Sequence, residues 1–128
     1  MEISWESFSN VDSGRNYLGL VCYLERKSAL SFFNFLLRGR SIQGQLKGVK
    51  GLVGYSVRMG FFDKKSMALS VWEDENSLSD FVHAGEHSKT MVKLRPKMNQ
   101  SKFVRWKLLG SDVPPKWDDA IAKLKKST

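Results

Sequence analysis

The two histidines of the sequence, His83 and His87, are four residues apart, a spacing that places two imidazoles on one face of a continuous helix. Such a pair can chelate a metal ion. Gly85 lies between them and breaks the helical pattern, and only Glu86 stands nearby as a further ligand. We therefore expect no metal at the pair. We expect His83 to be structural or exposed, and His87 to act alone as a ligand, a proton shuttle or a hydrogen-bonding group in a pocket.

Two arginines, Arg58 and Arg105, stand in segments that read as strands. A guanidinium can hold a carboxylate through two parallel hydrogen bonds, so both are candidate ligand-binding residues, together with Tyr23 and Phe81. The alternative, which we favour, is that the arginines pair with Glu25 or with a second subunit. The tryptophans and phenylalanines are first of all core and interface residues, although a cavity that they line would admit a flat apolar ligand.

The sequence lacks the motifs of several common enzyme classes. It has no glycine-rich phosphate loop, no Ser-His-Asp order and no paired-carboxylate signature, so it predicts no nucleotide chemistry. The single cysteine, Cys22, lies in an apolar run, which indicates a buried thiol in a reducing, cytoplasmic protein. No stretch reaches the roughly 18 apolar residues of a membrane span, and no leader is recognisable. We therefore expect a soluble protein with no membrane partner.

Composition favours one folded domain over residues 1–128, since 41% of the residues are hydrophobic and 27% are charged. The net charge is +8, and residues 87–111 carry basic side chains with no acid. These are Lys89, Lys93, Arg95, Lys97, Lys102, Arg105 and Lys107. The strip can attract phosphates, or it can be a solvated helix face and strand edge. Nucleic acid ranks third among the partners considered, because the strip lacks interleaved exposed aromatic residues.

Periodicity predicts the order strand, helix, strand, strand, helix, strand, which is the split βαβ arrangement of ferredoxin-like domains with an antiparallel sheet. We place strands at residues 17–25, 52–62, 66–72 and 102–110. The first helix begins after Ser28, and the second begins at Asp74 or Ser77 and ends at Arg95-Pro96 after an interruption at Gly85. Residues 15–110 would form the core, residues 1–14 an irregular arm, and residues 111–128 an extension with a tail helix.

Alternation along the strands divides the sheet into two faces. The face expected under the helices contains Leu18, Leu20, Cys22, Leu24, Val53, Tyr55, Val57, Met59, Met67, Leu69, Val71, Val104, Trp106 and Leu108. The opposite face would contain Gly19, Val21, Tyr23, Ser56, Arg58, Ala68, Ser70, Trp72, Phe103 and Arg105. This second set is too apolar to be left in water, so we expect a second copy of the chain to cover it, sheet against sheet.

The predicted order of elements, the sequence "SVW" at the end of the third strand and the helix "SLSDFVHAGEHSKTM" resemble the dimeric α+β-barrel superfamily. That group includes antibiotic-biosynthesis-type and haem-degrading monooxygenases. The run from Trp72 through Phe81 and His87 to "KFVRWKLLG" is most similar to the spheroidene-monooxygenase-like branch. The resemblance implies a homodimer and a pocket between sheet and helices, with Trp72 and His87 as catalytic residues and His87 as a haem ligand.

Two observations limit what the resemblance implies. Haem-degrading members have an asparagine on the first strand, and residues 17–25 have none. Alternation also places Trp72 on the face away from the helices unless a bulge shifts it. We therefore predict a small monooxygenase-like protein that acts on or binds a flat or polyene apolar ligand, with haem or no cofactor. The alternatives are a non-catalytic ligand-binding or dimerisation module and, third, a basic nucleic-acid-binding domain.

Overall fold

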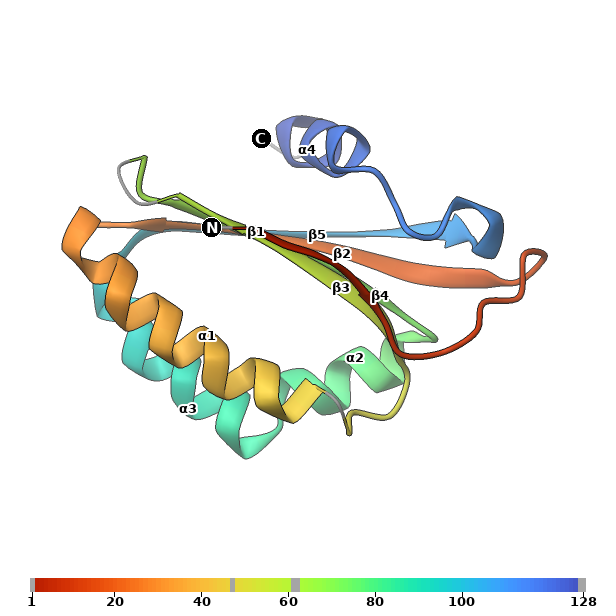
Figure 1. The fold of residues 1–128 in the computed structure, drawn as a ribbon, viewed down its shortest axis with the longest axis horizontal. Coiled ribbons are helices and arrows are strands. Elements are labelled where there is room, and N and C mark those ends of the chain that lie inside the picture. The colour runs from red at the N-terminus through yellow and green to blue at the C-terminus, as the bar shows by residue number, and fades with distance from the viewer. Residues whose placement is uncertain (1, 47, 61–62, 127–128) are drawn as a thin grey trace.

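The computed structural model describes residues 2–46, 48–60 and 63–126, apart from the side chains of residues 31, 39, 41–43 and 85–87. The elements in chain order are β1 (Glu2–Ser7), β2 (Asn16–Arg26), α1 (Phe32–Leu46), β3 (Leu52–Met59), β4 (Lys65–Trp72), α2 (Glu75–Val82), α3 (Gly85–Leu94), β5 (Met98–Leu109) and α4 (Trp117–Lys126) (Figure 1). Short 3-10 turns lie at Ala29–Ser31, Arg95–Lys97 and Gly110–Asp112.

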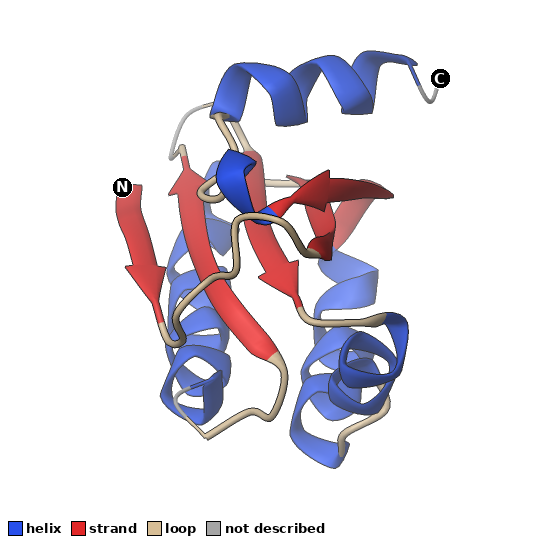
Figure 2. Ribbon diagram, turned by 90° about the vertical axis from the view of Figure 1, so that its right-hand side faces the viewer, coloured by secondary structure: helices blue, strands red, loops and turns tan. Residues whose placement is uncertain are grey.

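The described strands form one antiparallel sheet in the order β1-β3-β4-β2-β5. Strands β2 to β5, with α1 and the α2–α3 pair between them, follow the βαββαβ order, so the predicted ferredoxin-like α+β fold and its C-terminal helix are confirmed. Helices α1, α2 and α3 cover one face of the sheet, and α4 lies against the other (Figures 1 and 2). We call these the three-helix face and the α4 face. None of the helices within the described ranges is long and apolar enough to span a membrane.

The N-terminal segment differs from the irregular arm that we expected for residues 1–14. Residues Glu2–Ser7 form β1, which adds a fifth strand at the free edge of β3. Ile3 lies opposite Val57, and the Ser56 hydroxyl donates to the carbonyl of Ile3 at 2.7 Å. The segment alternates half-buried and exposed positions, as an edge strand does. Six residues were too short a pattern to distinguish from a loop.

In β4, the side chains predicted to point toward the helices point to the α4 face, and those predicted to point away lie under the helices. Strand β2 has the expected orientation, with Leu18 and Leu20 on the three-helix face beside Leu78 of α2. Leu18 lies directly opposite Trp72, and the β2–β4 ladder has no register shift. Opposite residues in a ladder share a face, so Trp72 lies under the helices without any bulge in that ladder. The residues that turn to the α4 face instead are Met67, Leu69 and Val71.

Strand β5 is also inverted relative to the prediction, and one residue of β3 is displaced. Arg105 pairs with Leu20, which places this arginine on the three-helix face together with Phe103. The α4 face receives Val104, Trp106 and Leu108. In β3 the register shifts between Leu52 and Gly54, and Val53 packs on the α4 face.

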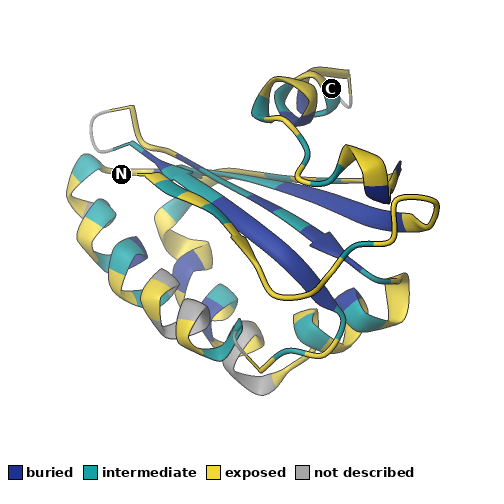
Figure 3. Ribbon diagram, turned by 45° about the vertical axis from the view of Figure 1, so that its right-hand side comes forward, coloured by how far each residue is buried: buried dark blue, intermediate teal, exposed yellow. Residues whose placement is uncertain are grey.

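Helix α4 covers part of the face for which we had expected a second copy of the chain. Ala120 and Leu124 of α4 are buried against Val21 and Leu69 of the sheet. At the other end of this face, Tyr17, Val53, Val71 and Leu108 are buried with Trp5, Val11 and Val113 packed on them. Figure 3 shows buried positions along the central strands. The chain itself therefore protects much of both faces from water.

A buried arginine joins the sheet to α1. Arg26, at the end of β2, is fully buried and donates to the Ser66 hydroxyl at 2.9 Å and to the carbonyl of Gly60. Its guanidinium lies over the rings of Phe32 and Phe35, 5.4 and 5.8 Å from their centroids. Burial lowers the pKa of Arg26, and the neighbouring Asp63 acts in the opposite direction. The residue holds the β3–β4 hairpin against the beginning of α1.

Candidate functional site

The structure brings Trp72 and Phe81 together on the three-helix face. Their ring centroids are 5.3 Å apart, and Trp72 is 2% exposed. The indole Nε1 donates to the hydroxyl of Ser70 at 2.9 Å, so its one polar group is satisfied within the sheet. Around the two rings lie Leu18, Leu20, Leu52 and Leu78. Alternation placed Ser70 and Trp72 on one face, but it did not indicate that the hydroxyl of Ser70 would accept from the indole.

A cleft of about 330 Å³ lies next to this cluster. It is bounded by the beginning of β2, the segment after β4 and the second half of β5. Its lining residues are Asn16, Tyr17, Leu18, Glu73, Asp74, Glu75, Arg105, Trp106 and Lys107. Leu18 belongs both to this wall and to the Trp72 cluster. Of the predicted site residues whose side chains are described, Arg105 is the one that lines the cleft.

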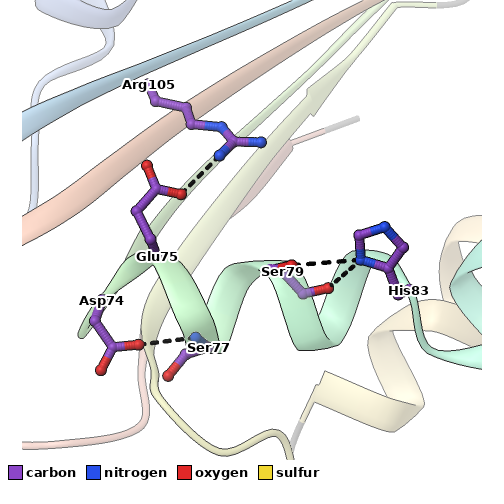
Figure 4. Close-up of polar contacts among 6 residues, drawn as sticks. All are labelled: Asp74, Glu75, Ser77, Ser79, His83 and Arg105. Atoms are coloured by element: carbon purple, nitrogen blue, oxygen red, sulfur yellow. Dashed lines mark hydrogen bonds and ion pairs between the residues drawn. The ribbon is translucent and has the colours of Figure 1, made fainter.

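An ion pair crosses the cleft. Arg105 Nη1 donates to Glu75 Oε2 at 2.7 Å, and the two side chains are 52% and 62% exposed (Figure 4). An ion pair in that much water contributes little to stability, at most about 1 kcal/mol. Glu75 therefore orients the Arg105 guanidinium only weakly, and the anionic group of a ligand can replace the Glu75 carboxylate as its partner.

The acidic rim of the cleft is also the beginning of α2. The Asp74 carboxylate caps the helix by accepting from the backbone N–H of Ser77 at 2.8 Å (Figure 4). Hydrogen bonds from the backbone N–H and the side chain of Ser77 lower the pKa of Asp74 below its usual range, and the charges of Arg15 and Lys50 act in the same direction. The predicted start of this helix at Asp74 or Ser77 is thus explained by one interaction between the two residues.

Arg58 and Tyr23 lie on the α4 face, away from this cleft. Arg58 Nε donates to Glu2 Oε1 at 3.0 Å, and the guanidinium lies 4.7 Å from the ring centroid of Trp117. The Tyr23 hydroxyl donates to Glu25 Oε2 at 3.1 Å. Burial raises the pKa of Tyr23, and Glu25 adds to the effect. Arg58 and Arg105 pair with Glu2 and Glu75, and the expected partner Glu25 accepts from Tyr23 instead.

The two histidines lie in different helices. Exposed His83 ends α2, and its Nδ1 lies 2.8 Å from the carbonyl of Ser79, to which it donates in the matching tautomer (Figure 4). His83 therefore has the structural role that we expected. Helix α2 ends at Val82 and α3 begins at Gly85, as the predicted break requires. His87 belongs to α3, but its side chain lies outside the described residues, so its predicted role stays a prediction.

The described residues around the cleft do not fit haem iron. They supply carboxylates, a guanidinium and an ammonium, and they include no imidazole or thiolate. The Tyr17 side chain points to the α4 face, where its hydroxyl accepts from the backbone N–H of Asp12 at 3.0 Å. Burial raises the pKa of the Cys22 thiol from 9.0 to about 12, against an opposing effect of Arg105. Within the described part of the chain no three His, Cys, Asp or Glu side chains gather to hold a metal.

A second, wider cleft of about 990 Å³ lies between β5, the segment after it and α4. Lysines line part of its rim, at positions 107, 116, 123 and 126. Trp106 and Lys107 contribute to both clefts, which therefore flank the same edge strand. Among the predicted site residues with described side chains, none lines this wider cleft.

The sequence of the chain matches a known protein family. Residues 40–127 match the model of a family described as a domain of unknown function, DUF3291. The chain belongs to this family. No curated protein matches the sequence. The family is part of the dimeric α+β-barrel superfamily, so the resemblance inferred from the sequence is confirmed.

Solved structures agree on the fold. An antibiotic biosynthesis monooxygenase superposes with a TM-score of 0.63 at 12% identity, over 70% of this chain and 95% of the other. A conserved protein from Methanosarcina mazei gives 0.64 at 15% identity, over 70% and 90% of the two chains. A protein from Nitrosomonas europaea, provisionally named an antibiotic biosynthesis monooxygenase, gives 0.65 at 11% identity over 82% and 97%. At these identities the likeness establishes the fold alone.

Proposed function

We propose that this chain is a monooxygenase-like protein that binds, and in the presence of oxygen acts on, a small flat apolar ligand carrying one anionic oxygen. The observation that carries the proposal is the cleft, in which Leu18 lies beside the cations Arg105 and Lys107. Its volume of about 330 Å³ is near the lower end of the roughly 300–1,000 Å³ usual for small-molecule sites. A compact ring system suits this volume better than a long polyene.

The two cations define the polar end of the ligand. A guanidinium and an ammonium side by side favour the ionised form of a bound phenol, enol or carboxylic acid, and lower its pKa. A phenolate or enolate is electron-rich, which is the state in which an organic molecule reacts most readily with oxygen. Arg105 would bind and orient this oxygen after exchanging its exposed bond to Glu75.

The alternative is a module that holds the same ligand without changing it. The chemistry of the described residues supports this version, since the buried Cys22 thiol is kept un-ionised and the cleft wall offers no described imidazole. The two versions agree on the ligand and differ in its fate. Incubation with oxygen separates them. With O2 as the only oxidant, an oxygenase converts a phenol to a quinone and water, so that the ligand gains one oxygen atom and loses two hydrogen atoms. A binding module returns the ligand intact.

We also propose a homodimer, which the superfamily relationship supports. Helix α4 lies where a second sheet would pack, with Ala120 and Leu124 seated on Val21 and Leu69. A sheet-to-sheet dimer therefore requires α4 to pack on the partner or to lie at the rim of the interface. Native mass spectrometry of the purified protein measures the subunit number, and a single subunit at micromolar concentration would contradict the dimer.

The two arginines supply a matched test of the ligand site. Using 2-naphthoate as the probe, we expect Arg105→Gln to weaken binding roughly tenfold to a hundredfold, since a hydrogen bond to a charged group contributes about 1.5–3 kcal/mol. Arg58→Gln removes a similarly exposed ion pair on the other face and should leave affinity unchanged. The uncharged amide of the probe should bind weakly to all three proteins. Equal losses in both variants would place the site elsewhere.

A further inference from the structure

The outer side of α1 exposes a stripe of large apolar side chains. Leu30, Phe33 and Leu37 are 75%, 57% and 69% exposed. Their spacing of three and four residues places them on one side of the helix and the turn that precedes it. Phe35, on the opposite side, is 3% exposed and packs in the cluster of Met59 under the sheet. The stripe therefore points away from the sheet, where proteins in water seldom gather side chains of this kind.

Helix α3 extends this surface. It lies in contact with α1 on the same side of the sheet (Figure 1). Thr90 and Leu94 are its buried side, and Leu94 joins the cluster that contains Phe35. Val92 is turned the other way and is 61% exposed. We call the exposed apolar residues of the two helices and the bases around them the outer helix surface.

The charge of the outer helix surface has one dominant sign. The sequence has no acid between Glu25 and Asp63, and none between Glu86 and Asp112. The side chain of Glu86, in the first turn of α3, lies outside the described residues. The exposed bases on or beside the two helices are Lys27, Arg40, Lys89, Lys93, Arg95 and Lys97. Apolar side chains and cations are thus interleaved on one convex surface, and neither cleft is lined by it.

The apolar and basic character of the outer helix surface distinguishes between the partners that could bind to it. A second copy packed symmetrically on this surface would bring the same cations face to face, which repels. A nucleic acid would match the charge but would leave the aliphatic Leu30 and Leu37 without a role, since bases stack on aromatic rings. An acidic peptide helix needs a groove, and both clefts lie elsewhere. An anionic lipid surface uses both features, because leucines enter the acyl boundary while lysines and arginines meet the headgroups.

We propose that the outer helix surface docks on the surface of an anionic membrane. Our expectation of no membrane partner considered only segments that could span a bilayer, and this contact needs no span. The site in the cleft opens between β5 and the beginning of α2, so membrane binding and ligand binding use different residues.

Vesicle co-sedimentation of the full chain tests the proposal. Vesicles of equal parts phosphatidylcholine and phosphatidylglycerol should bind the protein, and vesicles of phosphatidylcholine alone should bind far less. The pair Arg40→Gln with Lys93→Gln should weaken binding roughly thirtyfold, from about 1 kcal/mol for each base near the surface. The pair Leu30→Gln with Leu37→Gln should weaken it at least about tenfold. Both pairs change exposed residues, so the fold should be kept, and circular dichroism verifies this.

Matched variants on the α4 side control the measurement. Lys116→Gln with Lys126→Gln removes two exposed bases, and Leu109→Gln removes an exposed leucine. Neither should change vesicle binding by more than about twofold. Absence of binding to the anionic vesicles overturns the proposal. So does binding that resists the leucine pair, and so does equal capture by polyglutamate or duplex DNA with the same dependence on the arginine–lysine pair alone, since these results describe a general polyanion surface.

Discussion

Arg105 and Arg58 lie on opposite faces of one sheet and differ in little except what surrounds them. Each makes a single exposed ion pair, with Glu75 and Glu2 respectively. Arg58 rests on the ring of Trp117 of α4, while Arg105 borders a cleft beside an apolar cluster. The type of residue and its partner are thus the same, and only the space beside it makes one a candidate for ligand binding.

The three-helix face and the α4 face of the sheet are covered by different parts of the chain. The three-helix face is covered by helices that connect consecutive strands, and it encloses Trp72 completely. The α4 face is covered by the two ends of the chain, with α4 and the segment around Val11 packed on a sheet that could otherwise accept a partner. One face is therefore covered by segments from the middle of the chain, and the other by segments from its two ends.

The largest effect that we expect concerns how far the cleft extends along β2. Cys22 lies on the same face as Leu18, and burial raises its pKa to about 12. At about pH 8 its thiolate fraction is then roughly a thousandfold below that of a thiol with the ordinary value of 9.0. The reagent DTNB should therefore react very slowly with the folded protein and rapidly in denaturant. Rapid reaction in the folded state would mean that the cleft continues to Cys22.

The tryptophans on the two faces should differ in their effect on stability. Trp72→Ala removes a buried ring and should cost about 3–5 kcal/mol of unfolding free energy. Trp117→Ala removes a half-buried ring and one hydrogen bond from its Nε1 to the Ser56 hydroxyl, and should cost about 1–2 kcal/mol. Urea unfolding measures both values, with Trp72→Phe as the milder variant if the alanine protein does not fold. Similar costs would mean that α4 is as integral to the fold as α2.

The sequence predicted the order of the elements from β2 to α4 because each has a local signal, whereas β1 has none. Asp74 and Ser77 mark the beginning of α2, Gly85 separates the two helices, and Arg95-Pro96 ends the second. The phase of β4 had no such signal. A strand covered on both faces is apolar on both, so alternation does not tell one face from the other. Pairing of Leu18 with Trp72 decides the phase, and that contact is not local in sequence.

The candidate site was predictable only in part, for the same reason. Trp72, Phe81 and Arg105 lie on one face, but the alternation pattern put Trp72 and Arg105 on the other. Glu75 was not singled out, and Lys107 was named only as part of the basic strip, since a charged residue in a first helical turn or on an edge strand is ordinarily solvated. Arg26 also escaped notice, because nothing in a strand end indicates that its guanidinium will lie over two phenylalanine rings.

The smallest effect concerns the acid that borders the cleft. Hydrogen bonds from Ser77 depress the folded pKa of Asp74 below its ordinary value of 3.8. A depressed pKa means that the ionised cap stabilises the fold at every pH above that value, and that the contribution is lost as the pH falls through the folded pKa. Asp74→Ala should therefore lower the melting temperature at neutral pH, by an amount that shrinks as the pH falls below the ordinary carboxyl pKa of 3.8.

Two variants separate the charge of Asp74 from its capping oxygen. Asp74→Asn keeps an oxygen that can accept from Ser77, so its melting temperature should lie near that of the native chain at neutral pH and should lack the native chain's extra loss in acid. Asp118→Asn, in the first turn of α4, removes one negative charge on the other face and serves as the control. If Asp74→Ala lost the same stability at every pH, the cap would act through its hydrogen bond and not through its charge. The carboxylate bordering the cleft would then have no electrostatic role in holding α2 beside Arg105.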